Sequence, residues 1–198
     1  MIIINRQKVR FPKELIMKKK TIKNTQLTNY MTVLVRGTVM YSHITKLTTD
    51  EEREKDNLFR RDPIHKNYAT LILNNAEVLP QHANNPTIEE QYVQESLYRS
   101  YSNKAEGLCY YAIRIQHDHH MDNELPRVYV VKDENTRKEI IPENELAFGL
   151  NVTLSLMVTP DPEDETHIKK VMTLGAVFVD GPIKYQDEDQ NIIKKELI

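Results

Sequence analysis

The clearest pattern in the chain is an alternation of apolar and polar residues over positions 31 to 44, MTVLVRGTVMYSHI. One side of this extended stretch holds the residues Met31, Val33, Val35, Val39 and Tyr41. Arg36 and Thr38 fall on the other side, and a period of two predicts a half-buried strand. Gly37 inside the run predicts a bulge or a sharp bend, as small barrels need where a strand turns a corner.

Further strands are predicted by the same kind of pattern. They are YATLILNN at 68 to 75, GLCYYAIRIQ at 107 to 116, a hairpin over 126 to 142, AFGLNVTLSLMVTPDP at 147 to 162, and a last strand that ends at 182. The run MTLGAVFVDGP at 172 to 182 is apolar on both faces. Such a strand is expected to be covered on both sides, by a barrel interior and by a helix or a partner subunit.

One amphipathic helix is predicted over residues 86 to 104, where apolar residues recur at helical spacing. Thr87 can cap it, and Glu90 three residues later completes a capping box. The charged segment 49 to 67 is predicted as a long exposed loop with a helical turn. Several short strands without a βαβ rhythm indicate a mainly β fold, a barrel with extra strands, long loops and one helix.

The length and the charge distribution of the chain predict one domain with an extension at each end. Its 198 residues are 39% hydrophobic, which suits a single core. Residues 1 to 23 hold eight basic residues, Lys18, Lys19 and Lys20 among them, against one acid. That segment carries +7, so the rest of the chain carries −9 of the total of −2. We expect a basic arm at 1 to 28, a domain at 29 to 185 and a short acidic and mixed tail at 186 to 198.

The location of the protein is suggested by what the sequence lacks. The opening MIII precedes the basic residues, which reverses the order of a secretory signal, and no stretch approaches the about 20 apolar residues of a membrane span. Cys109, the single cysteine, lies in a predicted strand and is expected to be a buried thiol. These features predict an intracellular protein of the cytoplasm that does not enter a membrane.

The most concentrated candidate chemistry is a cluster of His117, Asp118, His119, His120 and Asp122. Imidazole and carboxylate groups bind zinc or manganese, so a metal-dependent enzyme is one interpretation, and a solvated loop is the other. The chain has no phosphate-binding glycine loop, no dinucleotide fingerprint and no nucleophile elbow. We therefore predict a protein that is not an enzyme and needs no cofactor or metal.

The outward side of the predicted strands carries a second candidate site. If the valines of 31 to 44, then Leu71 and Leu73, and then Ile113 and Ile115 point inward, an interleaved set of arginines and tyrosines points outward: Arg36, Tyr68, Tyr110, Arg114, Arg127 and Tyr129. Aromatic rings stack bases and guanidinium groups hold phosphates, as a single-strand binder requires. The lysines of the arm, Lys18 to Lys20, would add phosphate contacts. Tyrosines and arginines that merely fill amphipathic strand surfaces are the alternative.

The order of these segments resembles the OB-fold single-stranded DNA-binding proteins of bacteriophage replication systems. The resemblance rests on VRGTVMYSHI, YATLILNN, GLNVTLSLMVTPDP and VMTLGAVFVDG, and it covers about residues 31 to 185. A closing strand with a Leu-x-Ala-Val-like core is matched by Leu174, Ala176 and Val177. The resemblance implies an OB-fold-like five-stranded barrel that coats single-stranded DNA in replication or recombination, as a dimer and with replication partners bound through the C-terminal tail.

The sequence is compatible with two other functions. One is a structural or host-interaction β-protein of a phage, which would dock through its acidic body. The other is the metal-dependent enzyme that would use the cluster from His117 to Asp122.

Overall fold

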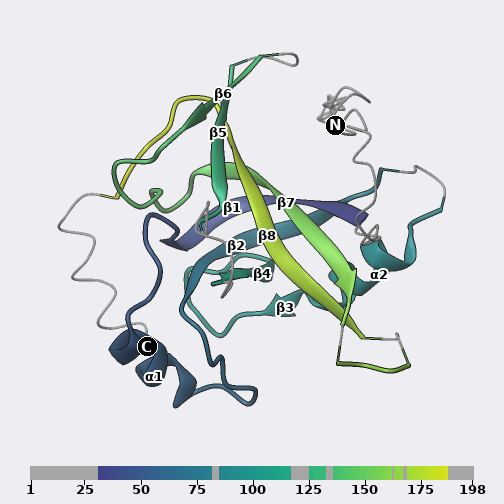
Figure 1. Ribbon diagram of the computed structural model, residues 1–198. Coiled ribbons are helices and arrows are strands. Elements are labelled where there is room, and N and C mark those ends of the chain that lie inside the picture. The colour runs from purple at the N-terminus through teal and green to yellow at the C-terminus, as the bar shows by residue number, and fades with distance from the viewer. Residues whose placement is uncertain are drawn as a thin grey trace, which may run out of the picture.

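The architecture is one long sheet, in a computed structural model that describes residues 31–81, 85–116, 125–132, 136–161, 163–166 and 169–186. Within these residues eight strands follow the order β3-β4-β2-β1-β7-β8-β5-β6 (Figure 1). Neighbouring strands are antiparallel except β5 and β8, which are parallel. The elements are β1 (Met31–His43), α1 (Asp50–Asn57), β2 (Tyr68–Leu79), α2 (Ile88–Glu95), β3 (Tyr98–Arg99), β4 (Leu108–Ile115), β5 (Arg127–Val131), β6 (Arg137–Ile140), β7 (Asn151–Pro160) and β8 (Lys170–Asp180).

The sheet curls so that β4 approaches β8, although three strands separate them in the hydrogen-bonded order. Arg114 Nη1 on β4 donates to the carbonyl oxygen of Leu174 on β8 over 3.2 Å. The hydroxyl of Tyr110 reaches Met172 Sδ at 3.5 Å. The predicted mainly β class is confirmed. The sheet has eight strands and does not close, because β3 and β6 remain as its edges.

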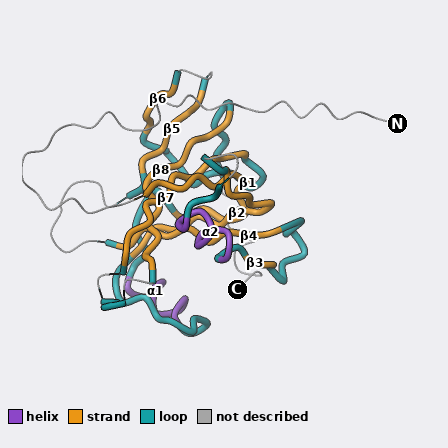
Figure 2. The backbone as a smooth tube through the Cα atoms, turned by 90° about the vertical axis from the view of Figure 1, so that its right-hand side faces the viewer, coloured by secondary structure: helices purple, strands orange, loops and turns teal. Residues whose placement is uncertain are grey.

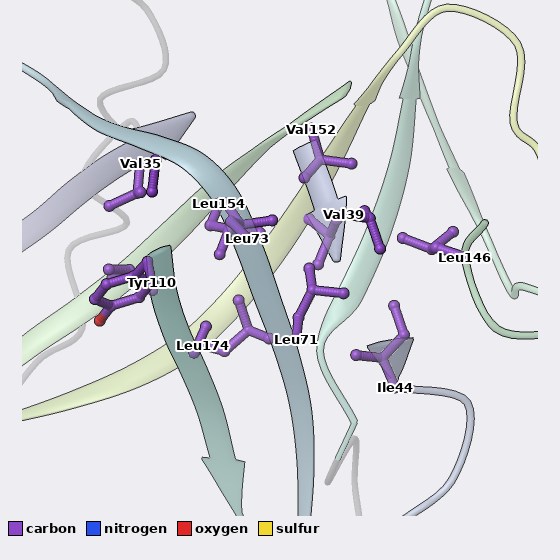
Figure 3. Packing of buried hydrophobic residues seen from close by; sticks show 14 of the residues in the cluster. Val35, Val39, Ile44, Leu71, Leu73, Tyr110, Leu146, Val152, Leu154 and Leu174 are labelled. Carbon is purple, nitrogen blue, oxygen red and sulfur yellow. The ribbon is translucent and has the colours of Figure 1, made fainter. Parts of the chain in front are cut away.

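The core fills the concave side of this curl, where the inward residues of β1, β2, β4, β7 and β8 meet (Figure 3). Val35, Leu73 and Leu154 are completely buried there, and Leu174 joins them from β8. Alternation along β7 places Val152, Leu154, Leu156 and Val158 in the core, as its sequence predicts. We name this side of the sheet the core face and the opposite side the outer face.

Gly37 lies at the predicted bulge. The pairing of β1 with β2 shifts between Arg36 and Thr38, which confirms an irregularity at this position. A Cβ atom on Gly37 would lie 2.8 Å from the carbonyl oxygen of Asn74, so the backbone of β2 approaches too closely for a side chain. Asn75 opposite has a positive φ of 51°, which is uncommon for a residue other than glycine. A second shift follows between Val39 and Tyr41.

Both helices begin with a capping box. Thr87 accepts a hydrogen bond from the backbone of Glu90 at the start of α2, and the Glu90 side chain accepts from the backbone of Thr87, as predicted. The helix ends at Glu95 rather than reaching residue 104, because the chain turns into β3. A second helix, α1, lies in the segment predicted as a loop with a helical turn. Within the described residues, neither helix has the length and apolar character that crossing a membrane requires.

Figures 1 and 2 place the β5–β6 hairpin and α1 at opposite ends of the sheet. The hairpin confirms the prediction for 126 to 142, and Cys109 is a buried free thiol as expected. The arm with Lys18, Lys19 and Lys20, the cluster from His117 to Asp122, and the tail from residue 187 onward lie outside the described residues.

Candidate nucleic-acid interface

One row of side chains crosses the outer face from β1 to β5. Arg36 pairs with Thr153 on β7, Thr153 pairs with Phe178 on β8, and Phe178 pairs with Tyr129 on β5. Directly paired residues of neighbouring strands share a face, so these side chains lie side by side. Adjacent strands lie about 4.8 Å apart, which puts Arg36 and Phe178 about 10 Å apart across the sheet.

Tyr129 and Phe178 form a stacked aromatic pair at one end of this row. Their ring centres are 5.2 Å apart and the rings are inclined by 16°. The guanidinium of Arg137 lies 5.8 Å from the centre of the Phe178 ring. Arg127 on the rim is exposed, and a hydrogen bond with the Tyr129 side chain is the main cause that raises the pKa of Arg127. Two guanidinium groups therefore adjoin one aromatic pair.

Arg36 extends the row at its other end. Its Nη2 lies 3.5 Å from Oδ2 of Asp180, and both side chains are about one-third exposed. Beside them is a polar hollow of about 400 Å³ that Arg36, Glu77, Asn151 and Asp180 help to line. Arg36, Arg127 and Tyr129 thus occupy the outer face as predicted. We define Arg36, Arg127, Tyr129, Arg137 and Phe178 as the outer patch.

The predicted outward orientation of Tyr110 and Arg114 is wrong. Tyr110 is 2% exposed and belongs to the core. It pairs with Leu73, and Arg114 pairs with Ala69, so both side chains project from the core face of β4. Burial is the main cause that lowers the pKa of Arg114, and the positive charge of Arg127 adds to it. Tyr111, predicted to lie in the core, takes the outer face instead.

Tyr68 does point away from the core, as predicted, but it is completely buried. Its hydroxyl donates to Oδ2 of Asp56 in α1, and the guanidinium of Arg60 lies 5.5 Å from the centre of its ring. The segment after α1 therefore covers the face that an exposed stacking platform would need. Of the three tyrosines predicted to form an exposed stacking platform, only Tyr129 lies on the outer face and keeps an accessible part.

A second aromatic row lies under this cover. Tyr41 pairs with Ile72 on β2, and Ile72 pairs with Tyr111 on β4, so the three side chains share the outer face. Arg60 donates to the hydroxyl of Tyr111, and its guanidinium carbon is 4.8 Å from the centre of that ring. Burial, followed by the charge of Asp56, raises the pKa of Tyr41 to about 12. We define Tyr41, Tyr68 and Tyr111 as the covered tyrosine surface.

Several of these residues were not singled out from the sequence. Phe178 stood in a run with both faces apolar, so the sequence did not show which face it takes; its pairing with Thr153 and Tyr129 places it on the outer face. The alternation predicted that Tyr41 shares the core side with Val39. The pairing of β1 with β2 shifts between these two residues, so the Tyr41 side chain takes the opposite face, and the sequence pattern does not reveal that shift. Nothing in the charged segment 49 to 67 marked Arg60 as the residue that contacts two tyrosines.

The charge on the outer patch is mixed rather than basic. Its three guanidinium groups are accompanied by carboxylates, since Glu77 pairs with Arg36, Glu139 pairs with Tyr129, and Asp180 contacts Arg36. Such a surface would hold phosphates weakly, so a strand bound here would depend on stacking as well. Among the described residues no group of three or more His, Cys, Asp or Glu is arranged to hold a metal ion.

Comparison of the chain with protein-family models, with curated proteins and with solved structures finds no match.

Proposed function

We propose that this protein binds single-stranded DNA without catalysing a reaction, and that the strand lies across the outer patch. The observation that carries the proposal is the Tyr129 and Phe178 pair with the guanidinium groups of Arg127 and Arg137 beside it. A base stacks on the accessible part of Tyr129 while the arginines hold the neighbouring phosphates. Arg36, on the same face, holds the strand where it crosses β1.

The preference for single strands follows from the chemistry of this patch. A stacked ring needs an unpaired base, and the bases of a duplex are already stacked on one another. The interspersed carboxylates of Glu139 and Asp180 disfavour the dense phosphates of a duplex. Proteins that coat duplexes usually present a continuous basic face, which this patch does not have.

The resemblance of the strand pattern to phage single-strand binders supplies the finer part of the proposal. We place the protein in phage DNA replication or recombination in the cytoplasm of the host cell. The C-terminal tail recruits replication or recombination proteins, and two copies form a dimer. The basic arm, with Lys18, Lys19 and Lys20, adds affinity without base preference because it contacts phosphates alone.

The proposal is tested with a fluorescent oligo-dT and the full chain. Replacing Tyr129 with alanine is expected to remove about 1–3 kcal/mol of binding, the usual value of one stacked base. Tyr101→Ala is the matched control, since Tyr101 is fully exposed in the loop after β3. Equal effects of the two replacements would assign the binding to some other part of the protein.

A second candidate is a protein that docks on a host partner. It is favoured by Leu58 and Phe59, adjacent apolar side chains that are 78% and 77% exposed at the end of α1. Exposed apolar patches often mark protein interaction sites. This candidate predicts that Leu58→Ser and Phe59→Ser abolish partner binding while the protein shows no affinity for oligo-dT.

A further inference from the structure

Segment 49 to 67 contacts the outer face of β2 and β4 through the polar side chains of Asp56 and Arg60. Its helix α1 buries no residue in the described part of the chain. Two of its apolar side chains, Leu58 and Phe59, face solvent, and Ile64 is half-buried. We name residues 49 to 67 the α1 segment. An element with so little apolar burial belongs to the parts of a protein that open at low cost.

The contacts that join the α1 segment to the covered tyrosine surface are made by Asp56 and Arg60. Asp56 accepts from the hydroxyl of Tyr68, and Arg60 donates to the hydroxyl of Tyr111. The guanidinium of Arg60 also lies over the rings of Tyr68 and Tyr111. Internal bonds, such as those between Asn57 and Ile64, hold the segment in shape without tying it to the sheet.

The closed arrangement leaves buried polar atoms unsatisfied. Nε of Arg60 and Nε2 of His43 are buried and have no hydrogen-bond partner among the described residues. His43 is 7% exposed and pairs with Thr70, so it shares the outer face with Tyr68. A buried polar atom without a partner costs free energy, which opening of the segment would recover through water.

We propose that the covered tyrosine surface is a second single-strand site and that Arg60 occludes it until a strand displaces the α1 segment. This proposal rests on the proposed function. A base and a guanidinium compete for the same ring face, because both are attracted to the π-system of tyrosine. When the segment opens, Tyr111 presents its ring to a base, and the half-buried Tyr41 lies in the same row.

If a strand must displace the α1 segment, the affinity of the protein for single-stranded DNA depends on the free energy of opening that segment as well as on the contacts with the strand. Part of the stacking free energy is spent on opening, so the closed protein binds more weakly than one whose cover is absent. Removing the Arg60 side chain is therefore expected to strengthen binding. The opposite is expected of an arginine that contacts phosphate, whose loss weakens binding and reduces the salt dependence.

The test compares Arg60→Ala with Arg61→Ala in the full chain, by titration with fluorescent oligo-dT. Both variants lose one positive charge, but Arg61 has no ring contact with the covered tyrosine surface among the described residues. Arg60→Ala is expected to tighten binding at least about fivefold, the lower range of base stacking on an aromatic ring, and Arg61→Ala is not. Arg60→Ala together with Tyr111→Ala is expected to abolish the gain. Arg60→Lys keeps the positive charge but loses the planar contact with the rings, so it is expected to raise the affinity for oligo-dT by less than Arg60→Ala does. This variant replaces Arg60→Ala in the test if the alanine variant does not fold.

The outcomes separate this inference from the proposed function. If the unmodified protein binds oligo-dT through Tyr129 and Arg60→Ala binds equally or more weakly, the occlusion is wrong and the proposed function stands. If the unmodified protein does not bind and Arg60→Ala does, the covered tyrosine surface is supported and the outer patch is rejected. If neither binds, both are wrong.

Discussion

Tyr110 and Tyr111 are neighbours in β4 that project from opposite faces of the sheet. Tyr110 is buried against the core, where its hydroxyl reaches Met172 on β8. Tyr111 lies on the outer face beneath the guanidinium of Arg60. The two rings therefore have different surroundings, since Tyr110 joins β4 to β8 through the core and Tyr111 contacts the α1 segment on the outer face.

Replacing Tyr110 with alanine should destabilise the fold by about 3–5 kcal/mol, because it empties a buried aromatic site. Thermal or urea unfolding measures the change. Tyr110→Phe keeps the ring and should cost much less, and Tyr129→Ala should also cost less, because Tyr129 is half-buried and loses mainly its stacking on Phe178. A Tyr110→Ala variant as stable as the parent would contradict the placement of this ring in the core.

Gly37→Ala should lower stability by about 1–3 kcal/mol, the usual cost of forcing an extra group into a packed site. The added Cβ would lie 2.8 Å from the carbonyl oxygen of Asn74, so β1 and β2 must separate at the bulge. Gly175→Ala is a milder comparison, since the closest atom to its Cβ lies at 3.2 Å. Equal melting temperatures for Gly37→Ala and the parent would show that the bulge is wider than the structure has it.

Alkaline pH should destabilise the protein through its buried tyrosines. Burial raises the pKa of the half-buried Tyr41 from the ordinary 10.0 to about 12, and it also raises the pKa of the buried Tyr110. A raised pKa in the folded state means that stability is fully present below pH 10 and is lost as pH rises toward 12. Unfolding curves recorded across this pH range should show that the Tyr41→Phe variant loses less stability than the parent protein. An identical loss in both proteins would mean that Tyr41 ionises freely.

Glu145 should stabilise the end of β1 as a carboxylate. Burial opposes its ionisation, but hydrogen bonds from Ser42, from the side chain and backbone of Thr45, and from the backbone of Ile44 outweigh burial and lower its pKa. Glu145→Gln should lower the free energy of unfolding by about 1.5–3 kcal/mol at neutral pH, the value of one hydrogen bond to a charged group. Because the pKa of Glu145 is lowered in the folded state, its carboxylate contributes this stability above pH 4.5 and loses it as the pH falls through the lowered pKa. The difference in stability between the variant and the parent should therefore shrink in acid.

The exposed Glu143 provides the control for that prediction, since Glu143→Gln changes a carboxylate two residues away. Thermal unfolding at neutral and at acid pH measures both variants. If Glu145→Gln and Glu143→Gln were equally harmless, the carboxylate of Glu145 would not hold the end of β1.

Alternation predicted most of the strands because their faces differ in polarity. In β7 each valine or leucine is followed by a polar residue or methionine, so its inward side was evident. In β4, LCYYAIRI is apolar at both parities, and only its pairing with Leu71 and Leu73 decides that Ala112 and Tyr110 face the core. The same ambiguity reversed Arg114. A strand with two apolar faces contains no register information of its own.

The candidate site was less predictable than the fold because it depends on contacts between distant segments. Tyr68 was assigned to the correct side, yet its exposure is set by Asp56 and Arg60 in a segment whose composition indicated a solvated loop. The pairing of Tyr129 with Phe178 depends on the parallel alignment of β5 with β8, which a local pattern does not contain.

Binding to the outer patch is tested by titrating the full chain with oligo-dT and with a matched duplex at several salt concentrations. The single strand is expected to bind more tightly than the duplex. Three phosphate contacts from Arg36, Arg127 and Arg137 should give a logarithmic salt slope of about −2, made steeper by any contacts from the basic arm. Equal affinity for the duplex and the single strand, or no affinity for either at low salt, would contradict the claim that the outer patch holds single-stranded DNA.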